Sequence, residues 1–323
     1  MLKAYKKVLA TAFLVGACLG SAYSQTKGPG DFPNKRITIY AAGPSGITDL
    51  AARQVAQGLS QELGQPVVVD NRSSLVTAQV VAKSPPDGYS LLYTAGSLWI
   101  NQLTSNVPYD IHRDFVPISL VHDAPQILAV HPSLPVKNIK EFIALAKAKP
   151  GALNYGGSDS IGAGSNLAAE LLAYMAKIDF QRIPYKSGSL RMTALISGEI
   201  HFAFITGVIY SQLPKGRLRF LGVTVQKPLP VAPDIPPISN TLPGYESRQV
   251  GGLFAPSGTP APIVNRLAQS VIRALKRPEI REKITNAGVE VEGNTPEEFA
   301  NFIKQEMASM GKVIKARGLR EGK

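Results

Sequence analysis

Small polar residues and glycines follow several apolar segments of this chain, in a pattern that suits the binding of an anion. The first such loop, 41–47, lies between a β-branched run and a helix that Thr48 and Asp49 are expected to cap. Similar loops occur at 94–97 and 156–166. Free amide groups at a helix N-terminus carry partial positive charge, and small side chains let a ligand approach them. The pattern predicts a binding cleft for a small anion.

No group of residues in the sequence supplies a nucleophile together with its base, so we expect no enzyme. A G-x-S-x-G elbow and a complete G-x-x-x-x-G-K-S/T phosphate loop are both missing, and Leu167 replaces the third glycine of a dinucleotide fingerprint. The histidines do not have the spacing of metal ligands: His112, His122, His131 and His201. We therefore expect no cofactor and no metal. An exported hydrolase that uses the serine-rich loop at Ser158 is the alternative.

The N-terminus has the pattern of a secretory signal peptide, which we place at 1–24. A positively charged start and the apolar segment 8–19 are followed by small residues at Ala22 and Ser24, where a signal peptidase would cut. The apolar segment is too short to span a membrane as a stable helix. We therefore expect a soluble periplasmic protein. Lipid anchoring at Cys18, the one cysteine of the chain, is the alternative.

The charge of the chain is positive but dispersed. Its formal net charge is +12, and part of this lies in the signal segment. Long runs of lysine and arginine with interleaved aromatic residues are missing, so we expect no nucleic-acid partner. A mildly positive surface suits an anionic ligand.

Strands alternate with helices along the mature chain, which predicts an α/β fold with parallel sheets and ligands at the carboxyl ends of the strands. Strands are expected at 37–40, 67–69, 91–93, 115–121, 126–130, 153–155, 178–183, 199–204, 218–225 and 249–254. Helices are expected at 48–63, 77–83, 139–149 and 167–177, before Gly198, and after Thr259 and Thr295. Asn138 with Glu141, and Thr295 with Glu298, form capping-box pairs.

Two strands in near-continuous succession, 115–121 and 126–130, indicate that the chain passes from one sheet into another. Pro125 lies between them, and 249–254 is expected to return to the first sheet. The prediction is two domains. Domain 1 is discontinuous, with 25–126 and 248–323, and domain 2 is 127–247.

Seven motifs, taken in order, resemble those of a known family. They are LGQPVVVDNR at 63–72, PDGYSLL at 86–92, TAGS at 94–97, LNYG at 153–156, PYK at 184–186, APSGTP at 255–260 and TPEEF at 295–299. Over 32–317 the chain resembles the periplasmic substrate-binding proteins of tripartite tricarboxylate transporters, the Bug family. The resemblance implies a type II periplasmic binding protein whose two α/β domains close on a ligand. It also implies a monomer that delivers the ligand to an integral membrane permease and has no catalysis.

The family's ligands are small carboxylates held by backbone amides, hydroxyls and bridging waters. Carried over by position, the resemblance implies these ligand-binding residues: Ala42, Gly43, Ser45, Gly46, Asp49, Thr94, Ser97, Ser158, Ser160, Gly164, Ser165, Asn166, Lys186, Ser187 and Gly188. Two alternatives stay open, since Asp49 could only cap its helix and Lys186 could only face solvent.

The chain departs from the family's pattern in ways that add apolar surface. Ser45 replaces a glycine, 73–76 is a shortened segment, Leu98 and Asn166 stand where histidines are common, and Ile205 replaces an aspartate. The residues expected as apolar walls are Leu75, Val76, Leu98, Trp99 and Ile205. These walls, with one anion site in each domain, suggest an aromatic dicarboxylate such as terephthalate.

Three alternatives to that reading stay open. The ligand could be a C4–C6 aliphatic di- or tricarboxylate, as is usual in the family. Leu98 and Trp99 could be core residues rather than walls of the cleft. The protein could also be the ligand-sensing partner of a membrane sensor kinase, which would share the same fold.

Overall fold

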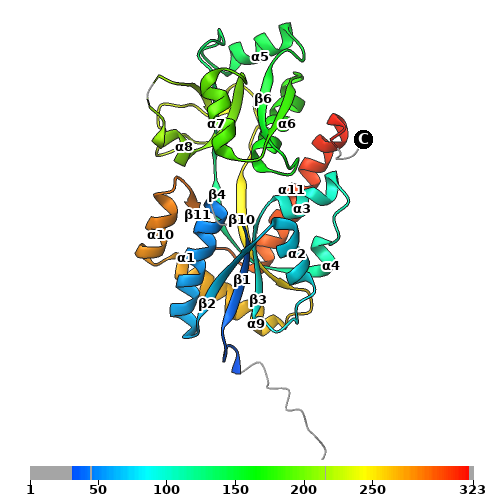
Figure 1. The fold of residues 1–323 in the computed structure, drawn as a ribbon, viewed down its shortest axis with the longest axis vertical. Coiled ribbons are helices and arrows are strands. Elements are labelled where there is room, and N and C mark those ends of the chain that lie inside the picture. The colour runs from blue at the N-terminus through cyan, green and yellow to red at the C-terminus, as the bar shows by residue number, and fades with distance from the viewer. Residues whose placement is uncertain (1–30, 44–45, 215, 320–323) are drawn as a thin grey trace, which may run out of the picture. The chain divides into compact units, whose positions relative to one another are not determined.

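The computed structural model describes residues 31–43, 46–214 and 216–319 (Figure 1). The predicted signal peptide and Cys18 lie outside these residues. None of the helices in the described part of the chain combines the length and apolar character that a membrane span requires.

Six strands of the described chain form the first sheet, in the order β11-β4-β10-β3-β1-β2. Strands β1, β2 and β3 are parallel, and β10 is antiparallel to β3 and β4. The strands are β1 (Ile37–Ala42), β2 (Val67–Arg72), β3 (Ser90–Ala95), β4 (Phe115–Ala124), β10 (Gln249–Pro256) and β11 (Glu290–Val291). The helices that pack around them are α1 (Gly46–Leu63), α2 (Ser74–Ala82), α3 (Ser97–Thr104), α4 (Ile111–Asp114), α9 (Ala261–Leu275), α10 (Pro278–Thr285) and α11 (Pro296–Arg317).

The second sheet has five strands within the described residues, in the order β7-β6-β8-β5-β9. Strand β6 is parallel to β7 and β8, whereas β5 is antiparallel to β8 and β9. Its strands are β5 (Gln126–Val130), β6 (Asn154–Ser158), β7 (Gln181–Tyr185), β8 (Phe202–Thr206) and β9 (Arg219–Val223). The helices of this part of the chain are α5 (Ile139–Ala148), α6 (Gly164–Ala176), α7 (Gly188–Ser197), α8 (Gly207–Gln212) and the 3-10 turn η2 (Ile238–Asn240).

Apolar side chains cover both faces of each sheet. Leu91 and Leu92 are neighbours on β3, but Leu91 packs in the core beside α1 while Leu92 packs in the core that contains Trp99. Ile127 and Leu128 on β5 divide between the two faces of the second sheet in the same way. Strands buried on both faces have near-continuous apolar sequences, which is why they are visible as short apolar runs.

The chain passes between the two sheets at two points. Strand β4 ends at Ala124 and β5 begins at Gln126, with only Pro125 between them, as the sequence predicted. Strand β10 begins the return at Gln249, and Gln126 Nε2 donates to Gln249 Oε1 at 3.3 Å. Every strand of the second sheet lies between the two crossings. The exact domain boundaries at 127 and 248 stay a prediction.

Two predicted helix caps are confirmed. The Asn138 side chain accepts from the Glu141 amide, and Thr295 with Glu298 forms a reciprocal capping box. In a capping box the Glu141 carboxylate would accept from the amide of the capping residue Asn138. At the start of α5 it accepts instead from the amide of Lys137, one residue earlier.

Several predicted boundaries are wrong. Helix α1 begins at Gly46 rather than at Thr48, and α6 begins at Gly164 rather than at Leu167. Helix α3, which begins at Ser97 within the predicted loop at 94–97, was not predicted. Glycine and small polar residues suit the start of a helix, where the amides have no partner within the helix, so the apolar period used for the prediction begins later than the helix itself. Strands predicted at 178–183 and 199–204 lie at 181–185 and 202–206. Short elements without a clear apolar period were missed, namely α4, α8, α10 and β11.

Candidate ligand-binding cleft

Loops at the strand ends of both sheets line a cavity of about 640 Å³. Thr94 and Ser97 contribute from the first sheet, and Ser158 and Ser160 from the second. A smaller cavity of about 180 Å³ shares part of this lining and extends to the start of α7. The two cavities share Ser158, Ala163, Gly164 and Gln249.

Most of the ligand-binding residues implied by the resemblance line one of these two cavities. They are Thr94, Ser97, Ser158, Ser160, Gly164, Ser165, Lys186, Ser187 and Gly188. These residues come from the β3–α3, β6–α6 and β7–α7 connections, which are separated by up to about a hundred residues in the sequence. The fold therefore assembles three of the four predicted loops around one space.

The β1–α1 loop contributes differently. Ala42 and Gly43 line neither of the two cavities, Gly46 is the first residue of α1, and Ser45 lies outside the described residues. Asp49 is buried inside the first turns of α1. Its carboxylate accepts from Arg53 Nε at 3.1 Å and from Asn71 Nδ2 at 2.9 Å. It is therefore part of a bonded side-chain network rather than the residue that begins the helix.

Asn166 is a buried residue whose side chain holds the β6–α6 loop in place by hydrogen bonds to the loop backbone. The residue is 1% exposed. Its Nδ2 donates to the carbonyl of Ser158 at 3.0 Å and of Ser160 at 2.6 Å, while its Oδ1 accepts from the Ser158 amide at 3.0 Å. A Cβ at Gly157 would lie 2.6 Å from that Oδ1, so the glycine leaves the space that Asn166 fills. The side chain shapes the loop that lines the cavity.

Two helix N-termini face the smaller cavity. Ser187 caps α7 by accepting from the Leu190 amide, whereas Ala163 at the start of α6 offers no side-chain acceptor. Lys186 precedes Ser187 at the N-terminus of α7 and lines the same cavity. Partial positive charge from the helix ends and the full charge of Lys186 make this a favourable place for an anion.

Arg191 is a residue of this site that the sequence reasoning missed. Its side chain lines the smaller cavity from the first turn of α7, and its Nη1 donates to Ser165 Oγ at 3.1 Å. The sequence did contain a signal for this residue. Arg191 follows the capping Ser187 by four positions, and that spacing places its side chain near the N-terminus of the helix.

The predicted apolar walls are only partly correct. Leu75 and Leu98 line the larger cavity. Trp99 and Ile205 are 0% and 1% exposed and belong to hydrophobic cores. The alternative that Trp99 is a core residue is therefore confirmed, and the expectation that Ile205 lines the cleft is wrong. Helix α3 begins at Ser97 and turns Trp99 into the core, where its Nε1 donates to Glu306 at 2.6 Å. Val76 is exposed and lines neither cavity.

Glu306 places a titratable acid in the wall of the larger cavity. Burial raises the pKa of Glu306 from 4.5 to about 7, although the hydrogen bond from Trp99 acts in the opposite direction. This cavity and the smaller one therefore differ in charge, because the smaller one is lined by Lys186 and Arg191.

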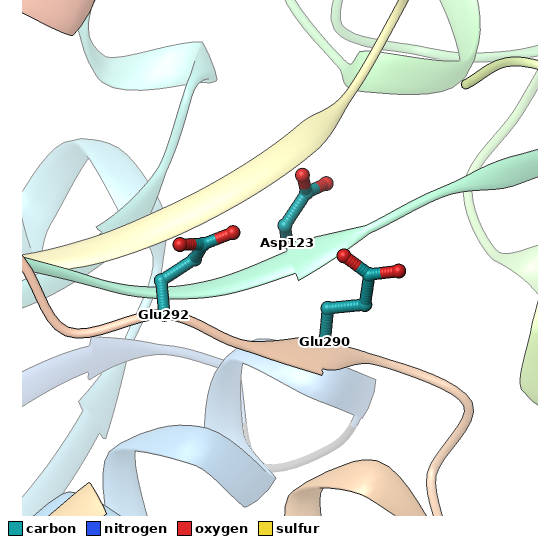
Figure 2. Close-up of side chains that lie close together, drawn as sticks. All are labelled: Asp123, Glu290 and Glu292. Atoms are coloured by element: carbon teal, nitrogen blue, oxygen red, sulfur yellow. The ribbon is translucent and has the colours of Figure 1, made fainter. Parts of the chain in front are cut away.

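A second group of acids lies where the chain crosses between the sheets. Figure 2 shows Asp123 on β4 and Glu290 and Glu292 of the β11 segment with their carboxyl groups close together, and their oxygens lie within 4.8 Å of one another. Arg248 forms an ion pair with buried Asp123 and with Glu246. Burial raises the pKa of Asp123 from 3.8 to about 6, while Arg248 opposes that rise. The crossing thus combines an arginine with an excess of carboxylates.

Comparison with known proteins identifies this architecture. The family model described as "Tripartite tricarboxylate transporter family receptor" matches residues 51–319. A Pseudomonas sp. (strain P51) protein, the "UPF0065 protein in tcbD-tcbE intergenic region", is 32% identical over 93% of this chain and 92% of its own length. "Protein BugT" of Bordetella pertussis is 28% identical over 85% of this chain and 86% of its own length.

Solved structures agree with the sequence relatives. The structure of "R. palustris Rpa4515 with adipate" has a TM-score of 0.79 and 31% identity, covering 90% of this chain and 99% of that one. "MatC (Rpa3494) from Rhodopseudomonas palustris with bound malate" has a TM-score of 0.75 and 27% identity, covering 88% and 100%. The "periplasmic binding protein BugD" has a TM-score of 0.75 and 28% identity, covering 90% and 99%.

These findings confirm the predicted periplasmic-binding-protein fold and the predicted family resemblance. They also remove the hydrolase alternative, because the matched family consists of receptors of transport systems and not of enzymes. The chain belongs to the tripartite tricarboxylate transporter receptor family, to which the Bug proteins are related.

Proposed function

We propose that this protein captures a small organic dicarboxylate in the periplasm and delivers it to a permease of the tripartite tricarboxylate type. The observation that carries the proposal is the cleft itself. Serine and glycine loops of both sheets line the larger cavity, and the smaller cavity that shares part of this lining is bordered by Lys186, Arg191 and two helix N-termini.

The chemistry of this lining favours a carboxylate over a neutral solute. Hydroxyl groups, free amides and cations all donate hydrogen bonds, and a carboxylate accepts several of them at once. The relatives whose structures hold adipate and malate point in the same direction. A volume of about 640 Å³ is ample for an acid of four to six carbons.

An aliphatic C4–C6 acid is the first choice of ligand. Trp99 and Ile205 were expected to hold an aromatic ring, and both lie in the cores instead. An aromatic dicarboxylate such as terephthalate is the second candidate, because Leu75, Leu98 and Leu167 still give the larger cavity an apolar wall.

The remaining predicted features belong to the same proposal. The signal peptide 1–24 exports the chain, and 127–247 forms a second domain inserted between the two parts of the first. The mature protein acts as a monomer. The β1–α1 loop, with Ala42, Gly43, Ser45 and Gly46, supplies donors to the ligand after the domains close around it. Asp49 and Asn166 support the two loops from behind through the bonds described above.

A thermal-shift screen of the mature protein tests this function. The panel contains succinate, malate, adipate, citrate and terephthalate, with hexanoate, benzoate and glucose as comparisons. We expect a dicarboxylate to raise the melting temperature most, because a ligand that binds only the folded state stabilises it by mass action. A response to glucose alone, or to no acid in the panel, would contradict the proposal.

Delivery is tested separately in cells. Deleting the gene should abolish uptake of the radiolabelled acid that the screen identifies, and the wild-type gene on a plasmid should restore it. Unchanged uptake, with a lost response of a sensor kinase to the same acid, would favour the sensing role.

A further inference from the structure

Arg191 combines two features among the arginines of the described chain: it has no acidic partner, and one of its nitrogens is buried without a hydrogen bond. Arg53, Arg72, Arg113, Arg248, Arg273, Arg277 and Arg317 each form an ion pair with an aspartate or glutamate. Arg191 has no such partner among the described residues, and its Nε is buried without a hydrogen-bond partner. The residue as a whole is half-buried and lines the smaller cavity, but a buried Nε without a partner costs free energy, so its position calls for an explanation.

The surroundings of Arg191 hold the side chain in place. Its Nη1 donates to Ser165 Oγ at 3.1 Å, which ties α7 to the first turn of α6. A Cβ on Gly156 would lie only 3.0 Å from Arg191 Cγ, so the missing side chain at 156 makes room for the arginine stem. The guanidinium is thus fixed between the N-termini of two helices before any ligand arrives.

The other charged residue that lines the smaller cavity adds to the charge of Arg191. Asp159 of the β6–α6 loop lines the larger cavity instead and accepts from Ser158 Oγ and from the Ser160 amide. Lys186 lines the smaller cavity, and the helix N-termini contribute partial positive charge. The one tyrosine of the lining, Tyr185, donates its hydroxyl to Glu199 at 2.9 Å, so Glu199 is engaged outside the cavity lining. An anion that enters this cavity would supply the missing counterion.

We propose that Arg191 binds one carboxylate of the ligand and gives the protein its preference for dicarboxylates over the corresponding half-amides. The inference rests on the proposed function, since it assumes that the cleft takes a small carboxylate. The planar guanidinium suits a carboxylate because its parallel N–H groups can donate to both oxygens. The other carboxylate binds at the opposite side of the cleft, at the loops of the first sheet.

The test compares each diacid with its monoamide, which keeps the length and removes one charge. The probes are adipate with adipamate and terephthalate with terephthalamate, measured by calorimetry on the wild type, Arg191→Gln, Arg191→Lys and Arg217→Gln. Arg217 is an exposed arginine of the same part of the chain and lines neither cavity, so its variant is a control for net charge. Thermal unfolding without ligand shows whether each variant is folded.

The wild type and Arg217→Gln should bind the diacid about tenfold or more tightly than the monoamide. Arg191→Gln should bind the diacid and the monoamide with about equal affinity. The affinity ratio of Arg191→Lys should lie between those of the wild type and Arg191→Gln. If Arg191 had only a structural role, Arg191→Gln would weaken the binding of diacid and monoamide by the same factor, and the ratio of their affinities would stay as in the wild type. That result would overturn the inference and leave the proposed function standing. If neither adipate nor terephthalate binds the wild type, the comparison is made with the diacid that the thermal-shift screen identifies and its monoamide; if no diacid of that panel binds, the proposed function fails and the inference fails with it.

Discussion

The two sheets each present a loop that an asparagine holds in place, and the two arrangements differ in burial. In the first sheet Asn71 Nδ2 donates to the carbonyl of Gly43 at 2.8 Å and to Asp49, while its Oδ1 accepts from Arg53. In the second sheet Asn166 makes its bonds to the backbone of Ser158 and Ser160 while fully buried. Asn71 is half-buried, so water can replace part of its bonding.

The two loops also differ in charge. Arg53 beside the first loop is paired with Asp49, so the local charge is neutralised. Arg191 beside the second loop has Ser165 as a partner but no acid among the described residues. The same strand, loop and helix pattern therefore produces a neutral loop in one sheet and a cationic one in the other. Burial and counterions, rather than the helix N-terminus alone, decide which loop is the stronger anion site.

The largest effect should come from removing the buried asparagine. Asn166→Ala removes three hydrogen bonds of a fully buried side chain, and we expect it to lower the free energy of unfolding by about 3–4 kcal/mol. The Ser158 amide loses its side-chain acceptor, whereas the carbonyls of Ser158 and Ser160 keep the Arg182 side chain and the Ala163 amide as donors. Asn71→Ala should lower it by only about 1 kcal/mol, because water reaches that site. Urea unfolding of both variants measures the difference. Equal losses would mean that burial does not distinguish the two loops.

An intermediate effect should come from the acid of the larger cavity. The pKa of Glu306 is raised from 4.5 to about 7, so the folded state favours the protonated form. This stabilisation is present below pH 4.5 and is lost as the pH rises through about 7. The loss amounts to up to about 3 kcal/mol over that interval. Glu306→Gln keeps an acceptor for Trp99 and should remove this dependence.

The measurement for Glu306 is the difference in unfolding free energy between the wild type and the variant from pH 4.5 to 7.5. Burial lowers the pKa of His122 to about 4, which gives a pH dependence of opposite sign, and taking the difference between the two proteins cancels it. A difference that stays constant with pH would show that Glu306 titrates normally.

The smallest effect concerns the two arginines in the protein without ligand. Arg53→Gln breaks a largely exposed ion pair and should cost about 0.5–1 kcal/mol. Arg191→Gln should cost less than that or even stabilise the protein, because no carboxylate loses its partner and a buried Nε without a hydrogen bond is removed. Thermal unfolding of the two variants side by side is the measurement. A clearly larger loss for Arg191→Gln would indicate that its bond to Ser165 is structural.

Much of the local structure could be predicted from the sequence. Short apolar runs marked the strands of both sheets, since strands buried on both faces need apolar residues throughout. Asn138 and Thr295 marked helix starts because capping bonds reach only three residues along the chain. The loops that line the cleft were identified for the same reason, because a loop at a strand end precedes the helix that follows it.

Contacts between distant residues decided the rest. The sequence left open whether Trp99 lies in the cleft or in the core, and in the structure Phe254 and Phe299 complete a core around it. Asp123 and Arg248 are 125 residues apart and meet only because both lie at the crossings between the sheets. Arg191 became a site residue once α6 and α7 were brought together.

The sequence by itself determined most of the longer elements, their order, three of the loops that line the cavities and the family resemblance, because each is marked by residues close together in the sequence. Only the tertiary structure decided which side chains are buried and which charges have a counterion. Burial and ion pairing arise from segments that fold against one another, and for Arg191 and Asp49 they separate two loops that are alike in local sequence.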